Sequence, residues 1–510
     1  MKMKKQIKIG ILTMLFIGLY GCESDFLDEQ PSQFLNIQQL EEAAEVNPAI
    51  AVGFVDGIYA YMVETFAGRG NGRHDDFGHK SHDLYSDLLS SDMALSVSTF
   101  GWYRAGITEY QSTQDFTFGE NLQVWSFYYT IIRSANTVIA IQGGADNVPE
   151  LEINQHILGQ ALALRAFAYY NLHLYYANDY NPNDEVLPLY DAAIGIGLPR
   201  STTSEIYALM EEDLNKAIDL LETFQRSGKA QINKTVAKGI LAYVIASTRE
   251  TSRMQEVANL TSEVMSESGA TLMNQGEVLG GFNDVNTPGW LWGIDLNEDL
   301  NIGLVSWWGQ VDHFSYSYAW AGDFKTIDSN LFDQIPNDDI RKLQFKFSGH
   351  PQENQGTNAS IFPLQPFYKF YDSGRVIGGA SQVVSADYVY MRYAEMLLLN
   401  AEANAKAGNT GAAQQSLFSL MSQRVPDASY VNTLSGQDLL DEIFLQTRIE
   451  LWGEGKTYQA IKRNQRNAER LGTNHLSFQG EIIPHNDNRM TFQIPEREIQ
   501  DNPEINTQNP

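Results

Sequence analysis

The sequence RYAEMLLLNAEA, residues 392–403, is a run of strong helix formers with alanines spaced along it. We expect a helix over residues 390–406, because the pattern continues in both directions and stops at the Gly408-Asn409 turn. A second helical pattern follows over residues 412–424. Small side chains recur on both partners, which lets two antiparallel helices cross closely. This stretch therefore predicts a helical hairpin of the tetratricopeptide (TPR) type.

Similar helical patterns occur earlier in the chain. Residues 161–172 predict a strong helix, and Thr202 with Glu205 has the spacing of a capping box that opens a helix over residues 206–224. Residues 233–249 and 254–266 form another pair. The pairs are irregularly spaced and lack the full repeat consensus, so a generic helical bundle is the alternative. We predict a mainly α fold, a TPR-like hairpin scaffold spanning about 40–268 and 387–470.

Two segments interrupt this scaffold, at about 68–114 and 269–386. Both are rich in Gly, Asn and Asp, and the second holds five of the eight tryptophans. A connection of that length in a compact protein is usually functional or a subdomain of its own. We expect an irregular, aromatic-rich insertion that forms a ligand-binding face.

The first residues carry an export signal. Four lysines precede a short apolar run, and the run ends at Gly21-Cys22, which resembles a bacterial lipobox. This predicts a signal peptide over residues 1–21 and a lipid anchor on Cys22, the single cysteine of the chain. The mature protein would then be tethered to a membrane and would not span it.

Charge and composition limit the functional classes. Residues 1–21 contain four lysines and no acidic residue, so their removal would change the formal charge of the protein from −28 to −32. Such acidity opposes phosphate binding, so nucleic acid is excluded as a partner. No linker-like stretch divides residues 22–510, which we expect to form a single unit.

Several separated motifs, in this chain order, resemble the SusD/RagB family. After the lipobox they are Phe26-Leu27-Asp28 with Pro31; Trp125, Tyr128, Tyr129, Ile132, Ala135 and Asn136; Arg165-Ala166-Phe167 with Tyr169 to Leu172 and Tyr175; Arg392 to Glu395 with Ala401-Glu402-Ala403; Arg448, Glu450-Leu451 and Glu454-Gly455-Lys456; and Phe492, Ile494-Pro495, Glu498, Asn502-Pro503 and Gln508-Asn509. Lys456, where arginine is commoner, and Tyr458-Gln459 depart from the family pattern. We expect Arg392 and Glu395 to be a buried, paired charge with a structural role.

The resemblance implies about four TPR-like units and an irregular ligand face. It also implies an outer-membrane, exterior-facing lipoprotein that captures oligosaccharides or other nutrients, is not an enzyme, and forms a lid on a TonB-dependent porin. The residues agree, because sugar rings stack on aromatic side chains and sugar hydroxyls need polar groups at the rim. The candidate glycan-binding residues are Trp102, Tyr103, Trp307, Trp308, Tyr316, Tyr318 and Trp320.

Three alternatives stay open. A glycoside hydrolase cannot be eliminated, since a sequence does not show which carboxylates face one another. A lipoprotein of the same fold could capture peptide or glycoprotein, and a purely structural surface protein would leave the aromatic insertion without a role.

We expect no cofactor and no metal. The cluster of His74, His79 and His82 with Asp75, Asp76 and Asp83 could hold a divalent cation, but a solvated polar loop explains it as well. Gly453 to Thr457 imitates the end of a phosphate-binding loop, yet Glu450 stands where that motif needs its first glycine.

Overall fold

A computed structural model describes residues 37–68, 72–300, 302–314, 316–346, 363–374 and 383–509. Cys22 and the predicted signal peptide lie outside the described residues. The structure is built mainly of α-helices, with a few short two-stranded sheets.

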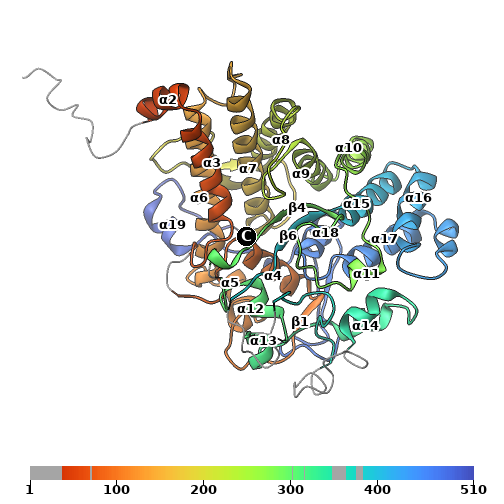
Figure 1. Cartoon of the computed structure of the whole chain (residues 1–510). Coiled ribbons are helices and arrows are strands. Elements are labelled where there is room, and N and C mark those ends of the chain that lie inside the picture. The colour runs from red at the N-terminus through yellow and green to blue at the C-terminus, as the bar shows by residue number, and fades with distance from the viewer. Residues whose placement is uncertain are drawn as a thin grey trace, which may run out of the picture.

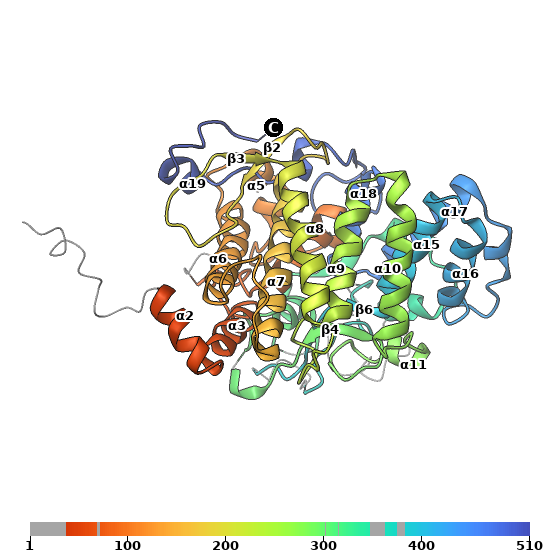
Figure 2. The same cartoon turned by 90° about the horizontal axis from the view of Figure 1, so that it is seen from above.

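A row of antiparallel helices crosses the molecule (Figures 1 and 2). Each helix packs against the next, including α10 against α15, which the long insertion separates in the chain. This is the mainly α, TPR-like scaffold that the sequence predicts. The row contains α3 (Ala49–Tyr61), α6 (Gly119–Ile141), α7 (Glu152–Tyr176), α8 (Thr203–Leu220), α9 (Lys234–Ser247), α10 (Met254–Glu267), α15 (Tyr393–Lys406), α16 (Thr410–Met421) and α17 (Gly436–Glu450).

The predicted local signals are present at the ends and contacts of these helices. The Thr202 hydroxyl accepts from the backbone N–H of Glu205, and the Glu205 carboxylate accepts from the backbone N–H of Thr202 at 2.8 Å, so the capping box is confirmed. Ala401 of α15 and Ala413 of α16 are both fully buried in one apolar cluster. Small side chains therefore stand at the crossing of this hairpin, as expected.

The two irregular segments form one layer beneath the row (Figure 1). Strand β1 (Met93–Leu95), from the first segment, pairs with β5 (Lys325–Ile327), from the insertion. Strand β4 (Trp290–Ile294) pairs with β6 (Tyr388–Arg392), so the start and end of the insertion lie side by side. The layer also contains α4 (His79–Ser90), α5 (Gln111–Gln114), α11 (Gln275–Val278), α12 (Trp307–Val311), α13 (Tyr318–Ala321) and α14 (Ser329–Gln334).

Smaller elements complete the chain. Helix α2 (Ile37–Val46) packs on α6. Two further two-stranded sheets are short: β2 (Glu185–Pro188) pairs with β3 (Arg200–Thr202), and β7 (Ala468–Glu469) pairs with β8 (Ile482–Ile483). Helix α18 (Lys456–Asn464) packs on α4, and α19 (Glu496–Asp501) lies in the C-terminal tail.

Two local predictions were wrong. Residues 390–392 belong to strand β6 and not to the following helix, because Tyr388 to Met391 pair with β4 and are buried on both faces. Residues 79–90 form helix α4, although we expected irregular structure there. All residues of α4 are buried, so its sequence lacks the apolar stripe of a surface helix.

The charged motif residues meet in one buried network. The Arg392 guanidinium donates to the carboxylates of Glu450 at 2.8 Å and Glu454 at 2.6 Å. The expected partner, Glu395, instead binds Lys456 at 3.1 Å and accepts from the backbone N–H of Arg392. Arg392 ends a strand and so does not share a helical face with Glu395, which corrects the predicted pair while keeping its structural role.

The C-terminal tail runs back over the N-terminal half of the chain. The backbone N–H of Phe492 donates to the Tyr175 carbonyl at 2.8 Å, and the Asn509 amide donates to the carbonyls of Tyr176 and Phe492. Ile494 is fully buried. The motif residues of the tail therefore attach it to α6 and α7.

Candidate functional site

Two distant segments meet at the edge of the lower layer, next to α13 and β1 (Figure 1). The pairing of β1 and β5 continues past the strands, since the backbone N–H of Thr99 donates to the Gly322 carbonyl at 3.2 Å. The backbone N–H of Phe100 donates to the Asp323 carboxylate at 2.9 Å. These bonds fix residues 99–102 beside residues 318–323.

Aromatic rings gather at this junction. The Tyr318 ring lies edge-on to Trp102 at 5.8 Å and to Phe100 at 5.1 Å, measured between centroids. His74 stacks on Trp102 at 5.5 Å, and its Nδ1 lies 2.5 Å from the Tyr318 hydroxyl. We call the following set the aromatic platform: His74, Phe100, Trp102, Tyr316, Tyr318 and Trp320.

The outer rings of the platform are open to solvent. Phe100 is 54% exposed, Tyr316 41% and Trp320 37%, which is high for large aromatic side chains. Trp102 is half-buried behind them, and Tyr318 is buried. The platform thus offers apolar rings to solvent, and the Phe100 ring is supported by the packed Tyr318 ring.

Charged groups border the platform. The Arg73 guanidinium lies 5.1 Å from the Trp102 ring centroid and is held by Asp75 at 2.9 Å and Glu120 at 2.6 Å. Desolvation lowers the pKa of His74 against the opposing effect of Asp75, which favours the neutral ring. A neutral imidazole has one donor and one acceptor nitrogen, of which Nδ1 already bonds to the Tyr318 hydroxyl.

Three of the predicted aromatics are core residues instead. Trp307 is 0% exposed, and Trp308 and Tyr103 are each 2% exposed. The Trp308 indole donates to the Ala386 carbonyl at 2.9 Å, and Lys80 lies over the Trp307 ring at 4.6 Å. No ring face of these three is available to a ligand, because they fill the interior of the irregular layer.

Of the seven candidates, the structure brings Trp102 and Tyr318 into contact, and Tyr316 and Trp320 are exposed on the same segment as Tyr318. Sequence reasoning missed Phe100, although it lies directly before Gly101 in the early irregular segment. It also missed Arg73 and His74 as platform residues, because the contact between residues 74 and 318 depends on the tertiary fold.

The histidines of the polar cluster at residues 74–83 do not form a metal site. His79 and His82 are buried on α4, and desolvation lowers the pKa of each well below its ordinary value. His79 Nδ1 lies 2.9 Å from the Tyr128 hydroxyl. Across the described ranges, no group of three or more His, Cys, Asp or Glu side chains has the geometry of a metal site.

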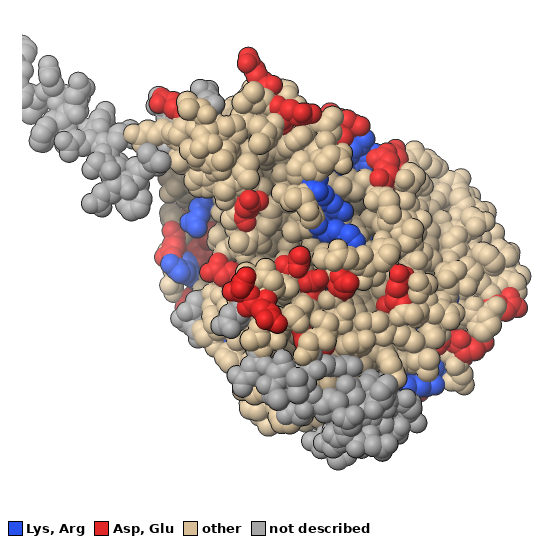
Figure 3. Space-filling model, in the orientation of Figure 1, with Lys and Arg blue, Asp and Glu red and all other residues tan. Residues whose placement is uncertain are grey.

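In the part of the chain that the structure describes, none of the helices combines the length and the apolar character needed to cross a membrane. Asp and Glu outnumber Lys and Arg on the face seen in Figure 3, in keeping with the formal charge of −28.

Comparison with known proteins identifies the fold and its family. Residues 337–510 match the model described as "SusD family", and residues 56–245 match the model described as "Starch-binding associating with outer membrane". The chain belongs to the SusD/RagB family. The SusD-like proteins P38 and P2 of Formosa agariphila are each 24% identical to this chain. The alignment with P38 covers 95% of this chain and 96% of P38. The alignment with P2 covers 96% of this chain and 97% of P2.

Solved structures share this SusD-like architecture. A SusD-like carbohydrate-binding protein of Bacteroides vulgatus superposes with a TM-score of 0.74 at 25% identity, covering 89% of this chain and 96% of its own. Surface glycan-binding protein A of Bacteroides thetaiotaomicron, solved in complex with laminarihexaose, superposes with a TM-score of 0.66 at 16% identity, covering 90% and 98%.

Proposed function

We propose that this protein captures an oligosaccharide or polysaccharide on the aromatic platform and delivers it to a TonB-dependent outer-membrane transporter. The observation that carries the proposal is the contact of Phe100 and Trp102 with Tyr318, which joins two segments more than two hundred residues apart and leaves Phe100 exposed. Apolar ring faces bind the C–H faces of sugars, while polar groups at the rim bind hydroxyls.

The relatives support this class of ligand. A protein of the same fold is known in complex with laminarihexaose, a neutral oligosaccharide. The platform here has the same suitability for a neutral sugar, since its cation Arg73 is already paired with two carboxylates. We therefore expect a neutral or weakly charged glycan on the platform.

We propose that the protein is anchored in the outer membrane and does not catalyse a reaction. Lipidation of Cys22 would tether the protein to the outer membrane, with the platform facing the exterior and the transporter beneath. Capture and transfer need neither catalysis nor a cofactor, so we propose a binding protein that leaves the glycan intact.

The test is affinity electrophoresis of the protein lacking residues 1–22 in gels that contain soluble polysaccharides, with reducing ends assayed in parallel. We expect one or more glycans to retard the protein without release of reducing ends. Trp320→Ala should remove the retardation. Tyr430→Ala is the matched control, because Tyr430 is 38% exposed but lies beside α16, on a different element.

Two results would contradict the proposal. Release of reducing ends would identify a glycoside hydrolase. Equal retardation of the parent protein and Trp320→Ala would place binding away from the platform. Copurification of a TonB-dependent porin with the lipidated protein tests the transporter separately.

A further inference from the structure

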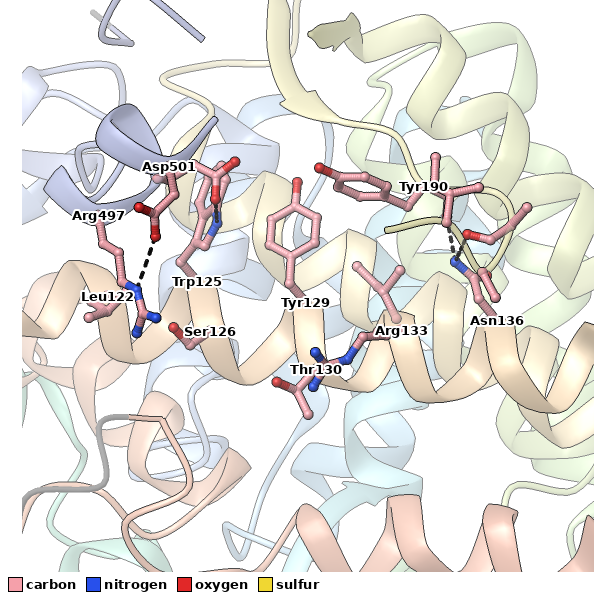
Figure 4. A pocket seen from close by; sticks show the side chains of 15 residues that line it. Leu122, Trp125, Ser126, Tyr129, Thr130, Arg133, Asn136, Tyr190, Arg497 and Asp501 are labelled. Atoms are coloured by element: carbon pink, nitrogen blue, oxygen red, sulfur yellow. Dashed lines mark hydrogen bonds and ion pairs between the residues drawn. The ribbon is translucent and has the colours of Figure 1, made fainter. Parts of the chain in front are cut away.

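A groove lies on a different part of the scaffold, between the exposed side of α6, the loop at residues 190–194 and the tail helix α19 (Figure 4). Its volume is about 300 Å³. This is at the lower end of the range for ligand pockets, so it has room for a short unit and not for a folded partner.

Aromatic and aliphatic side chains form the walls. The Tyr129 ring lies 4.7 Å from Trp125 and 5.8 Å from Tyr190, which stands edge-on to it. Ile194 is 42% exposed at the rim. The groove therefore presents a preformed apolar surface, and Tyr129 and Tyr190 are each half-buried and open to it.

The acceptors of the groove are already occupied by the protein. The Glu498 carboxylate accepts from the Trp125 indole at 3.2 Å and from the Asn502 amide at 2.9 Å. The Asn136 side chain accepts from Arg165 and donates to two backbone carbonyls. The acceptors of Glu498 and Asn136 are therefore engaged within the protein, and the carboxylate left exposed in the groove is that of Asp501.

Donors, in contrast, remain available. Arg133 lines the groove with its side chain exposed, and within the described ranges its guanidinium has no hydrogen bond or ion pair. The Ser126 hydroxyl likewise has no partner among these residues, and the Tyr190 hydroxyl accepts from the backbone N–H of Leu198, which leaves its own proton to donate. The ligand that completes this groove must supply acceptors.

The lining carries two cations, Arg133 and Arg497, and two carboxylates, Glu498 and Asp501, and Arg133 is the cation without an ion pair in the described ranges. At the other end of the groove, Arg497 and Asp501 neutralise each other in an exposed pair at 3.3 Å (Figure 4). The guanidinium of Arg133 is one turn along α6 from Tyr129 and has no such partner. At physiological salt, charges more than about 8 Å away are largely screened, so the charged groups that line the groove determine the electrostatic effect on a bound ligand.

We propose that this groove is a second saccharide-binding site, selective for a sugar unit that carries a carboxylate or a sulfate. The anion is assigned by Arg133 and the surplus of donors, and the sugar by the apolar walls together with the proposed function, on which this part rests. Guanidinium binds both anions through paired hydrogen bonds. A glycan that contains both neutral and acidic units would thus be held at two points, the neutral units on the platform and the acidic unit in the groove.

The test is isothermal titration of the mature lipoprotein in detergent with trigalacturonate, with its methyl ester and with a sulfated disaccharide. We expect an acidic ligand to bind at least tenfold more tightly than the neutral ester, and the affinity to fall with salt. Arg133→Gln should weaken that binding at least tenfold. Arg133→Lys should lose less, because it keeps the charge but not the planar fork.

Arg133→Gln should fold normally, since the side chain it replaces is exposed and without a partner among the described residues; an unchanged melting temperature verifies this. Trp320→Ala is the control that leaves the groove intact. Equal affinity for the acid and its ester, or no effect of Arg133→Gln, would overturn the proposal. Binding of an acidic peptide in place of the sugar acids would also overturn it.

The two proposals fail separately. Neutral glycans that bind in a Trp320-dependent manner while the sugar acids do not bind would refute the groove alone. If the sugar acids bind in an Arg133-dependent manner and no neutral glycan binds, the proposed function of the platform is refuted and the groove proposal stands.

Discussion

Replacement of Glu450 by glutamine should destabilise the protein strongly. The Glu450 carboxylate is buried and accepts from Arg392 at 2.8 Å, from Arg424 at 2.9 Å and from Arg341 at 3.2 Å. Burial would raise the pKa of Glu450, but the three guanidinium groups outweigh this and hold it well below its ordinary value. Glutamine has nearly the same size but removes the charge and points an amide donor at donors.

The expected loss follows from the unpaired cations. Removal of one partner of a buried ion pair costs about 3–5 kcal/mol, because the remaining charge stays desolvated. Three cations share Glu450, although Asp339 at 2.6 Å from Arg341 and Glu454 at 2.6 Å from Arg392 retain part of the pairing. We therefore expect Glu450→Gln to lower the free energy of unfolding by about 3 kcal/mol or more.

The free energy of unfolding of Glu450→Gln and of the parent protein can be measured by urea unfolding followed by tryptophan fluorescence. The matched control is Asp501→Asn, which removes an exposed carboxylate from a 3.3 Å pair with Arg497 and should change the unfolding free energy by less than about 0.5 kcal/mol. If Glu450→Gln lies within about 1 kcal/mol of the parent protein, the network is not a stabilising centre and the reasoning from burial is refuted.

Three further outcomes are expected. Burial raises the pKa of Glu454, but Arg392 and Lys369 outweigh it and lower the pKa from 4.5 to about 2. Because the pKa is lower in the folded state, the Glu454 carboxylate stabilises the fold above pH 4.5, and this stabilisation is lost as the pH falls toward 2. A midpoint of urea unfolding that stays constant between these pH values would contradict this prediction. Gly78→Ala should lower the melting temperature by several degrees, because Gly78 has φ +73° and an added Cβ would lie 2.1 Å from the Met62 carbonyl oxygen; an unchanged temperature would contradict the close approach. Cys22→Ala in the full chain should move the protein from the membrane fraction to the soluble fraction, and retention of the variant in membranes would exclude the lipid as the anchor.

Much of the scaffold is predictable from local sequence. The capping box at Thr202 and Glu205 and the alanines of α15 act over a few residues, so their patterns survive in the fold. Strand β6 was misassigned because Tyr388 to Met391 adjoin a strong helix former, and only the pairing with β4, about a hundred residues earlier, makes them a strand. Helix α4 was missed because a helix buried on all sides has no periodic apolar stripe.

The candidate site was predictable only in part. Trp102 and Trp320 have small or polar neighbours that suit an exposed loop, and the structure places them at one junction. Trp307 and Trp308 have the same composition around them but pack inward, because α12 directs both rings into the core. Whether a tryptophan is platform or core depends on contacts with residues far away in the chain, which a single sequence does not contain.

The position of the tail determines when the scaffold can be completed. A chain is synthesised and exported from its N-terminus, so α6 and α7 emerge several hundred residues before the segment that covers them. Until Phe492 and Asn509 bind the carbonyls at the end of α7, the indole of Trp125 lacks its acceptor on Glu498. The packing of α6 and α7 is therefore completed only by the last residues of the chain, and a molecule cleaved before residue 490 would leave Trp125 and the end of α7 without these hydrogen bonds.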